Sequence, residues 1–184
     1  MHRHRSIILV IVALIAAVVI ARQVQAPTSV GQSDGPIAAG PGLVLDVLDG
    51  DTARIRMAGY EGSVRIVGID TPEIEHPGKP AGCFGYEAAT AAKAWIQGRM
   101  VDVVPAREQR DHFGRLLARV VPHDGPIAGR DLARVLALSG FARELPMAPN
   151  LDDAGPLADR VAIARRLGRG LWSACSFATA FPGK

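Results

Sequence analysis

The sequence lacks the patterns that identify a zinc protein or a repeat protein. It contains two cysteines, Cys83 and Cys175, and no zinc-type spacing of cysteine and histidine, which argues against a structural zinc site. No segment repeats along the 184 residues, which argues against a solenoid or a propeller. A length of 184 residues with 48% hydrophobic and 21% charged residues is typical of one globular domain with an additional segment.

The chain also lacks an excess of either charge once its first 26 residues are set aside. It has 21 basic and 18 acidic side chains, and three of the basic ones, Arg3, Arg5 and Arg22, lie within residues 1–26, which contain no acid. The remainder therefore carries 18 charges of each sign. Net charge favours no particular partner, so a site for a polyanion would depend on a local arrangement of arginines.

Residues 1–26 indicate an export signal. A basic start, MHRHR, precedes fifteen uncharged residues from Ile7 to Ala21, and the short side chains of Val24 and Ala26 fit a cleavage site. The alternative is an uncleaved membrane anchor, since arginines at both ends of a short span can reach the interface. Either alternative predicts an exported protein, secreted or attached to the membrane with its folded part outside the cytoplasm.

The rest of the chain predicts a flexible linker, one folded domain and a short tail. Residues 27–41, PTSVGQSDGPIAAGP, are rich in Pro, Gly and Ser, as in flexible tethers. We expect the domain to occupy residues 42–178, and residues 179–184 to form the tail. Five β-rich runs and three helix-forming segments predict an α+β fold, a small five-stranded barrel with about three helices. The runs are 42–50, 51–57, 63–70, 101–106 and 116–121; the helices are 86–97, 131–139 and 156–167.

The segment VRIVGIDTPE, residues 64–73, is an apolar run typical of a buried strand, with an arginine near its start and two carboxylates at its end. If the second and third strands pair, Asp51 and Asp70 can converge with the Thr71 carbonyl on one cation. Oxygen donors favour calcium, magnesium or manganese over zinc or copper. The alternative is structural: Asp51 serves the turn around Gly50, and Asp70 caps the end of a strand.

Five motifs together resemble one family. In chain order they are LDGDT, VRIVGIDTPE, GYEA, DHFGR and GLW, and they resemble the staphylococcal nuclease (thermonuclease) family over roughly residues 42–175. The resemblance implies an OB-fold barrel with three helices. It also implies a calcium-dependent phosphodiesterase acting on DNA and RNA, preferably single-stranded, as a monomer.

The resemblance also implies roles for individual residues. Arg65 and Arg115 match the catalytic arginines that stabilise charge on the phosphate. Glu73 matches the carboxylate that acts on the attacking water as a general base. Asp51, Asp70 and Thr71 match the calcium ligands.

Two further side chains are candidate phosphate contacts, and one aromatic residue departs from the family pattern. Lys79 and His112 are the candidates, with ordinary solvated side chains as the alternative. Phe113 replaces a tyrosine that is present in well-known members, and it cannot hydrogen-bond a phosphate. The segment FARELPMAPN, residues 141–150, also lacks the tyrosines that flank the bound base there, so we expect weaker nucleotide binding.

The sequence leaves two hypotheses of function open. The first is an exported calcium-dependent nuclease. The second is a catalytically silent OB-fold module that binds nucleic acid or protein at the cell surface, which usually lacks the acids and arginines retained here. Export also predicts a disulfide between Cys83 and Cys175 that stabilises the domain, with two unrelated buried thiols as the alternative.

Overall fold

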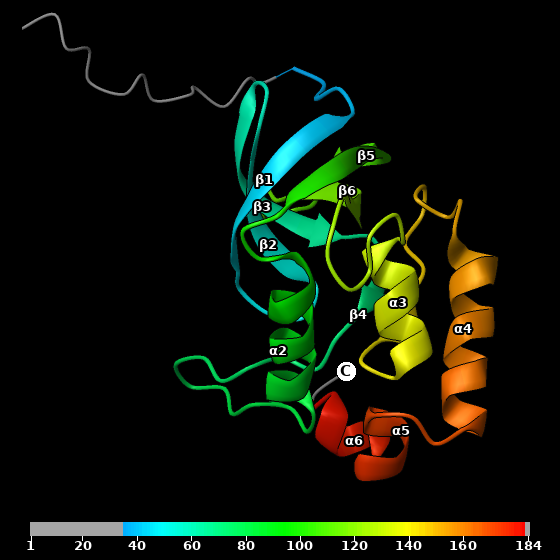
Figure 1. Cartoon of the computed structure of the whole chain (residues 1–184). Helices are drawn as coiled ribbons and strands as arrows, with labels where there is room; N and C mark the ends of the chain where they lie inside the picture. Colours follow the sequence, from blue (N-terminus) through cyan, green and yellow to red (C-terminus); the bar gives the residue numbers. More distant parts are fainter. Residues whose placement is uncertain (1–34, 183–184) are drawn as a thin grey trace, which may run out of the picture. The chain divides into compact units, whose positions relative to one another are not determined.

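The structure, a computed structural model, describes residues 35–182 (Figure 1). The predicted export signal and most of the predicted linker therefore lie outside the described residues. Within residues 35–182, no helix is both long and apolar enough to cross a membrane. The description below concerns this range alone.

Five strands form a closed barrel in the order β1–β2–β3–β6–β5. Their bounds are β1 Gly40–Val47, β2 Thr52–Met57, β3 Tyr60–Ile66, β5 Met100–Arg110 and β6 Leu116–Pro122. Neighbouring strands run antiparallel, except that β3 and β6 are parallel. This architecture confirms the predicted α+β fold with a five-stranded OB-fold barrel.

Alternating side chains of the strands fill the barrel. Val44, Ile55, Val64, Val101 and Leu116 are each at most 1% exposed. Successive side chains of a strand point to opposite faces, and β2 follows this rule with exposed Arg54 and Arg56 between buried neighbours. Burial of these β-branched and aliphatic side chains supplies much of the favourable free energy of folding.

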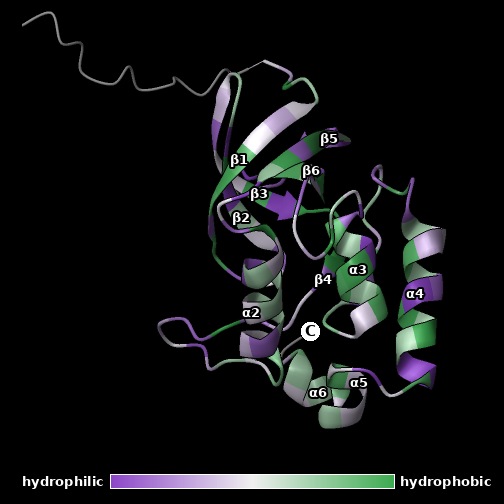
Figure 2. Cartoon of the chain, viewed as in Figure 1, coloured by the Kyte–Doolittle hydropathy of each residue, from purple (hydrophilic) through white to green (hydrophobic). Residues whose placement is uncertain are grey.

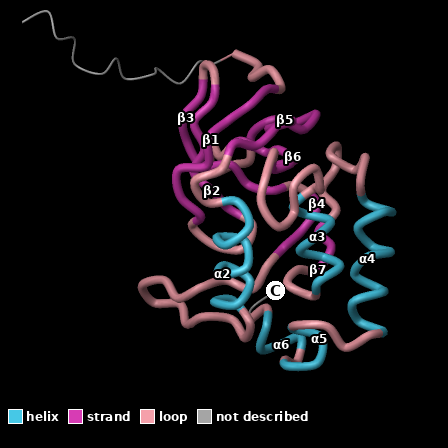
Figure 3. Tube along the Cα trace, in the orientation of Figure 1, coloured by secondary structure: helices cyan, strands magenta, loops and turns pink. Residues whose placement is uncertain are grey.

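The predicted strand over residues 63–70 is interrupted, and the prediction of one continuous strand is wrong at this point. β3 ends at Ile66, and a separate strand, β4, covers Gly68–Asp70. Gly68 has φ +81°, a conformation that glycine adopts without steric cost. β4 leaves the barrel and pairs antiparallel with β7, Arg143–Leu145, in a second small sheet (Figure 3).

Three helices correspond to the predicted ones: α2 Gly85–Ile96, α3 Leu132–Ser139 and α4 Ala154–Arg166. α2 is rich in alanine, the best helix former, and buries Ala88, Ala92 and Ile96 at a spacing of four residues. α3 begins after Asp131, whose side chain accepts a hydrogen bond from the Arg134 backbone N–H. Figure 2 shows α3 mostly apolar and α4 with polar bands, in keeping with the greater exposure of α4.

Two short helices follow α4: α5 Leu171–Ala174 and α6 Phe177–Ala180. In the view of Figure 1, α6 lies beside the lower end of α2, and α5 lies between α6 and the lower end of α4. The sequence predicts a domain that ends at residue 178, whereas Ala180 and Phe181 are 0% and 2% exposed. At the other end, Ile37 is buried and its backbone N–H donates to Gln109 Oε1 at 2.7 Å. Packed residues thus extend beyond 42–178 on both sides.

Candidate active site

Arg65 lies between two buried carboxylates. Its Nη1 is 3.0 Å from Asp51 Oδ1, and its Nη2 is 3.5 Å from Asp70 Oδ1. Arg65, Asp51 and Asp70 are only 7%, 5% and 3% exposed. Charges buried to this extent are rare unless they are paired, and the two aspartates supply the pairing for the arginine.

The strand register brings these residues together. In the β2–β3 ladder, Thr52 is opposite Arg65, so Asp51, directly before β2, reaches the same end of the barrel. The break between β3 and β4 turns two carbonyls towards the guanidinium, which donates to Ile66 O and Ile69 O, each at 2.9 Å. An arginine can therefore interrupt a buried strand because acceptors surround its N–H groups.

Asp51 is fixed by the loop that follows β4. Its Oδ2 accepts hydrogen bonds from the Thr71 backbone N–H at 2.8 Å and from Thr71 Oγ1 at 3.1 Å. A Cβ at Gly50 would lie 2.7 Å from Thr71 Oγ1, so only glycine permits this approach. Burial raises the pKa of Asp51 well above its usual range; Arg65 opposes this rise, and the carboxylates of Asp49 and Asp70 add to it.

Asp49 has a supporting role in the same turn. Its Oδ1 accepts a hydrogen bond from the Asp51 backbone N–H at 2.9 Å, the pattern of an Asx turn. Asp49 is therefore the residue whose side chain serves the turn around Gly50. The Asp51 carboxylate instead contacts Arg65 and Thr71.

Arg143 contacts the other side of Asp70. Its Nε and Nη2 are 3.0 and 2.9 Å from Asp70 Oδ2. Sequence reasoning missed this residue, because it approaches Asp70 through the pairing of β4 with the distant strand β7. No local pattern around Arg143 signals that partner.

Arg115 joins the group through a threonine. Its Nη1 is 3.5 Å from Thr52 Oγ1, which in turn donates to Asp51 Oδ1 at 3.2 Å. Its Nε donates to Asp111 Oδ2 at 2.7 Å. Burial alone would raise the pKa of Asp111, but the hydrogen bonds from Arg115 outweigh it and hold that pKa below its usual value.

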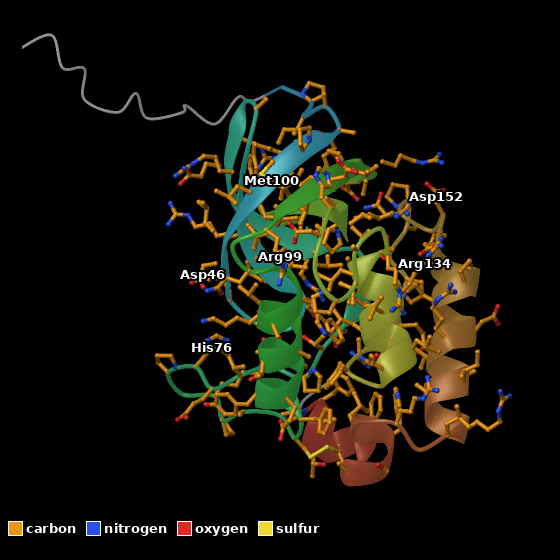
Figure 4. The ribbon with its side chains drawn as sticks, viewed as in Figure 1. Asp46, His76, Arg99, Met100, Arg134 and Asp152 are labelled. Carbon is orange, nitrogen blue, oxygen red and sulfur yellow. A yellow bond between two sulfur atoms is a disulfide. The ribbon has the colours of Figure 1, made fainter. Side chains whose placement is uncertain are left out.

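Glu73 lies two residues beyond Thr71 on the loop that precedes α2, with a side chain 30% exposed. Its backbone carbonyl accepts a hydrogen bond from the Gly82 N–H at 2.9 Å, which closes the loop. His76 Nε2 lies 3.8 Å from Glu73 Oε2, and Figure 4 shows His76 on this loop. Sequence reasoning missed His76, although its spacing of three residues from Glu73 was visible.

The two candidate phosphate contacts lie at the surface. Lys79 occupies an exposed turn in which its backbone and that of His76 exchange hydrogen bonds of 3.0 and 2.9 Å. The exposed His112 ring lies 3.7 Å, between centroids, from the ring of Phe113, which is 71% exposed. The Arg115 guanidinium lies 5.3 Å from the Phe113 centroid. The structure thus places His112 near a predicted catalytic arginine, and Lys79 on the same loop as Glu73.

Comparison with known proteins decides the family. A sequence model described as staphylococcal nuclease homologue matches residues 63–174. The chain belongs to this family.

Individual staphylococcal nuclease homologues support the assignment. The thermonuclease of Staphylococcus hyicus is 29% identical over 131 residues, which cover 71% of this chain and 74% of that protein. The thermonuclease of Staphylococcus intermedius is 36% identical over 109 residues, 59% of this chain and 61% of that protein. A probable endonuclease LCL3 of Arthroderma otae is 28% identical over 160 residues, 80% of this chain and 55% of that protein. The chain thus spans about half to three quarters of these relatives, whose names agree with the predicted class of enzyme, a nuclease.

The donor chemistry of this staphylococcal nuclease homologue suits a hard cation. Asp51, Asp70 and the Thr71 carbonyl would supply oxygen ligands, and a divalent cation would offset the negative charge of these two buried carboxylates. No cluster of three or more His, Cys, Asp or Glu suited to a metal occurs within residues 35–182. A cation would therefore depend on two carboxylates completed by a carbonyl and water.

Cys83 and Cys175 form the disulfide that the sequence led us to expect, with Cα atoms 6.0 Å apart. It joins the residues just before α2 to the end of α5, and Figure 4 shows it as a yellow bond beside α6. The bond therefore attaches the C-terminal helices to the loop that carries Glu73.

A separate cavity of about 220 Å³ lies between β5, α3 and the start of α4. None of the predicted site residues lines it. Each of its three arginines pairs with an aspartate that also lines it: Arg107 with Asp152, Arg119 with Asp131, and Arg134 with Asp153. Figure 4 labels Arg134 and Asp152. The aspartates neutralise the arginine charges, so the cavity lacks the excess positive charge that phosphate binding would require.

Proposed function

We propose that this protein is an exported calcium-dependent nuclease that hydrolyses phosphodiester bonds of DNA and RNA, preferably single-stranded, as a monomer. The observation that carries the proposal is the position of Arg65 between the buried carboxylates of Asp51 and Asp70. A buried charged group of this kind is costly for stability alone and is typical of functional sites. The names of the relatives, thermonuclease and probable endonuclease, support the same class of reaction.

Arg115 and Arg65 would stabilise the transition state. Hydrolysis adds negative charge to the phosphoryl oxygens, and fixed guanidinium groups bind such oxygens without reorganising. The Arg115 side chain is 30% exposed, so it can meet a substrate, and Asp111 holds it through Nε. Arg65 is more deeply buried and would act at the inner side of the phosphate.

Glu73 would orient and deprotonate the attacking water. Its side chain is partly exposed and lies two residues from Thr71. When bound, a calcium ion would supply Lewis-acid polarisation of a phosphoryl oxygen. Asp51, Asp70 and the Thr71 carbonyl would hold it, and Lys79 and His112 would contact more distant phosphates.

Export rests on the sequence of residues 1–26, as a cleaved signal or an anchor that keeps the protein at the membrane. N-terminal sequencing of exported protein should begin near Pro27 if the signal is cleaved. The full chain should instead sediment with membranes if it is not. Full-length protein in the soluble cytoplasm would contradict both.

Cleavage of single-stranded DNA by the purified protein, with calcium and with chelator, tests the activity. We expect Asp51→Ala and Asp70→Ala to abolish it, and Arg65→Ala, Glu73→Ala and Arg115→Ala each to lower turnover by about a hundredfold or more. Asp102→Ala is the matched control, since Asp102 pairs with His123 at the surface. Full activity in chelator would contradict the calcium dependence. Near-normal turnover in all three of the last variants, with the folded state verified, would contradict the catalytic roles of Arg65, Glu73 and Arg115. Absence of cleavage by the folded wild-type protein, with and without calcium, would instead favour the catalytically silent binding module.

A further inference from the structure

Arg143 occupies a position between the candidate cation site and two aromatic rings. Its guanidinium contacts Asp70 Oδ2 through Nε and Nη2. The Cζ atom of the same group lies 4.5 Å from the Phe181 ring centroid and 5.3 Å from the Phe177 centroid. The Arg143 side chain is 18% exposed, so the group is enclosed on both sides.

The two rings belong to residues 175–181, which we call the C-terminal segment. The disulfide from Cys175 to Cys83 and a hydrogen bond of 2.8 Å from the Cys83 N–H to Thr179 O attach this segment to the loop before α2. Ala180 and Phe181 are buried. The family match ends at residue 174, so the segment lies beyond the part of the chain shared with the family model.

These contacts restrict the orientation of the Asp70 carboxylate. The pairing of Asp70 with Arg143 between β4 and β7 fixes the two backbones, and the rings fix the plane of the guanidinium by cation–π contact. Because Arg143 engages Oδ2, Oδ1 is left on the side of Arg65 and Asp51. Oδ1, the oxygen on the side of the shared Arg65 contact, is the one that a cation bound with Asp51 would need.

We propose that Arg143 is a positioning residue that orients Asp70 for cation binding, and that the C-terminal segment holds Arg143 in place. The proposal rests on the proposed function, since it assigns Asp70 to the cation. It adds that residues beyond the family match set the affinity of the site. Partners that hydrogen-bond to metal ligands typically change affinity by about 10- to 100-fold when they are mutated.

The substitution Arg143→Lys separates orientation from charge. Lysine keeps the positive charge next to Asp70, but it has neither the planar face that packs on the rings nor a fixed pair of N–H donors. Phe177→Ala removes one of the two rings that pack on the Arg143 guanidinium and leaves Asp70 and Arg143 unchanged. Phe177 is already 46% exposed, so the fold should tolerate this substitution. Both variants leave the net charge unchanged, so a weaker affinity would reflect lost orientation.

Arg165→Lys is the matched control. The Arg165 guanidinium lies 4.2 Å from the Trp172 ring and pairs with Glu144 at 3.6 Å. It therefore has the same two kinds of partner as Arg143, an aromatic ring and a carboxylate, but Glu144 is not a proposed ligand. Loss of an arginine from a similar environment should leave cation binding unchanged.

The experiment is a luminescence titration of the full-length protein with terbium(III), followed by competition with calcium, and kinetics on single-stranded DNA at limiting and saturating calcium. We expect Arg143→Lys to bind the cation about tenfold more weakly and to lower kcat at limiting calcium, with an unchanged KM for DNA. Phe177→Ala should show a smaller loss in the same direction. Arg165→Lys should match the wild type.

The outcomes separate the two proposals. Wild-type cation affinity in a folded Arg143→Lys protein would overturn the positioning role while leaving the nuclease proposal intact. A loss in Arg143→Lys but none in Phe177→Ala would overturn the role of the C-terminal segment, and Phe177→Ala alone tests that role if Arg143→Lys does not fold. A wild-type protein that neither binds terbium nor cleaves DNA would overturn the proposed function and the positioning role together.

Discussion

Replacing Arg65 with methionine should strongly destabilise the protein in the absence of calcium. The substitution keeps much of the side-chain volume but removes the positive charge between Asp51 and Asp70. It also removes the hydrogen bonds to the carbonyls of Ile66 and Ile69. Two buried carboxylates and two carbonyl groups then lose a partner at once.

The expected loss is about 3 to 5 kcal/mol in the free energy of unfolding, the range for removal of one partner of a buried ion pair. This is a large fraction of the roughly 5 to 15 kcal/mol that stabilises a typical domain. Urea unfolding in the presence of chelator, followed by circular dichroism, measures it. Added calcium should recover part of the loss, because a bound cation would replace the missing positive charge.

Arg54→Met provides the comparison. Arg54 lies on the neighbouring strand β2 and also pairs with a carboxylate, Glu61, but its side chain is 57% exposed. Exposed pairs contribute little because water and salt screen them. If Arg65→Met lost no more stability than Arg54→Met in chelator, the argument that Arg65 compensates buried negative charge would be refuted.

Further predictions concern the support of the site. Asp111→Asn should lower turnover, because Arg115 loses the carboxylate that holds its Nε. The pKa of Asp111 lies below its usual value of 3.8. The Asp111 carboxylate therefore stabilises the fold above pH 3.8, and this stabilisation is lost as the pH falls further. Asp111→Asn, which lacks this carboxylate, should lose less stability on acidification. Serine at both Cys83 and Cys175 should lower the melting temperature, since the entropy model gives about 4 to 5 kcal/mol for a loop of this length. Gly85→Ala should unfold the protein or impair activity, because the new Cβ would lie 2.1 Å from the Glu73 carbonyl oxygen.

Three controls accompany these variants. Asp152→Asn removes a carboxylate that pairs with an arginine at the surface and is 81% exposed, so turnover should not change. Gly155→Ala introduces a Cβ with no atom within 4 Å and should leave activity intact. The third control tests the disulfide: the melting temperature of oxidised wild-type protein without free thiols is compared with that of a reduced sample. Equal melting temperatures would contradict its role in stability.

The sequence predicted the barrel because its signals are local. Alternation in β2 and the spacing of Leu157, Val161 and Ala164 in α4 each depend on neighbours in the chain. The proximity of Asp51 to the segment that carries Arg65 also followed from a local argument, since β2 and β3 are joined by a short turn. Helices and strands that are defined by periodicity and short connections can therefore be predicted from the sequence alone.

Other features depend on distant partners and could not be predicted. The run through Val67 looked continuous, but the chain turns at Val67 and Gly68 has a positive φ. β7 has three residues and α6 has four, too few for a period to show. Arg143 gains its role from the pairing of β4 with β7, and no local feature of residues 141–150 indicates that register.

The parallel pairing of β3 with β6 has a consequence for the timing of activity. Arg65 lies opposite Leu117 in that ladder, and these two segments are far apart in the sequence. Contacts of such separation form late, because loop closure must precede them. We therefore expect Arg115, which directly precedes β6, to join Arg65 and the two aspartates only when the barrel closes, so that an emerging or partly folded chain would lack one of the two predicted catalytic arginines.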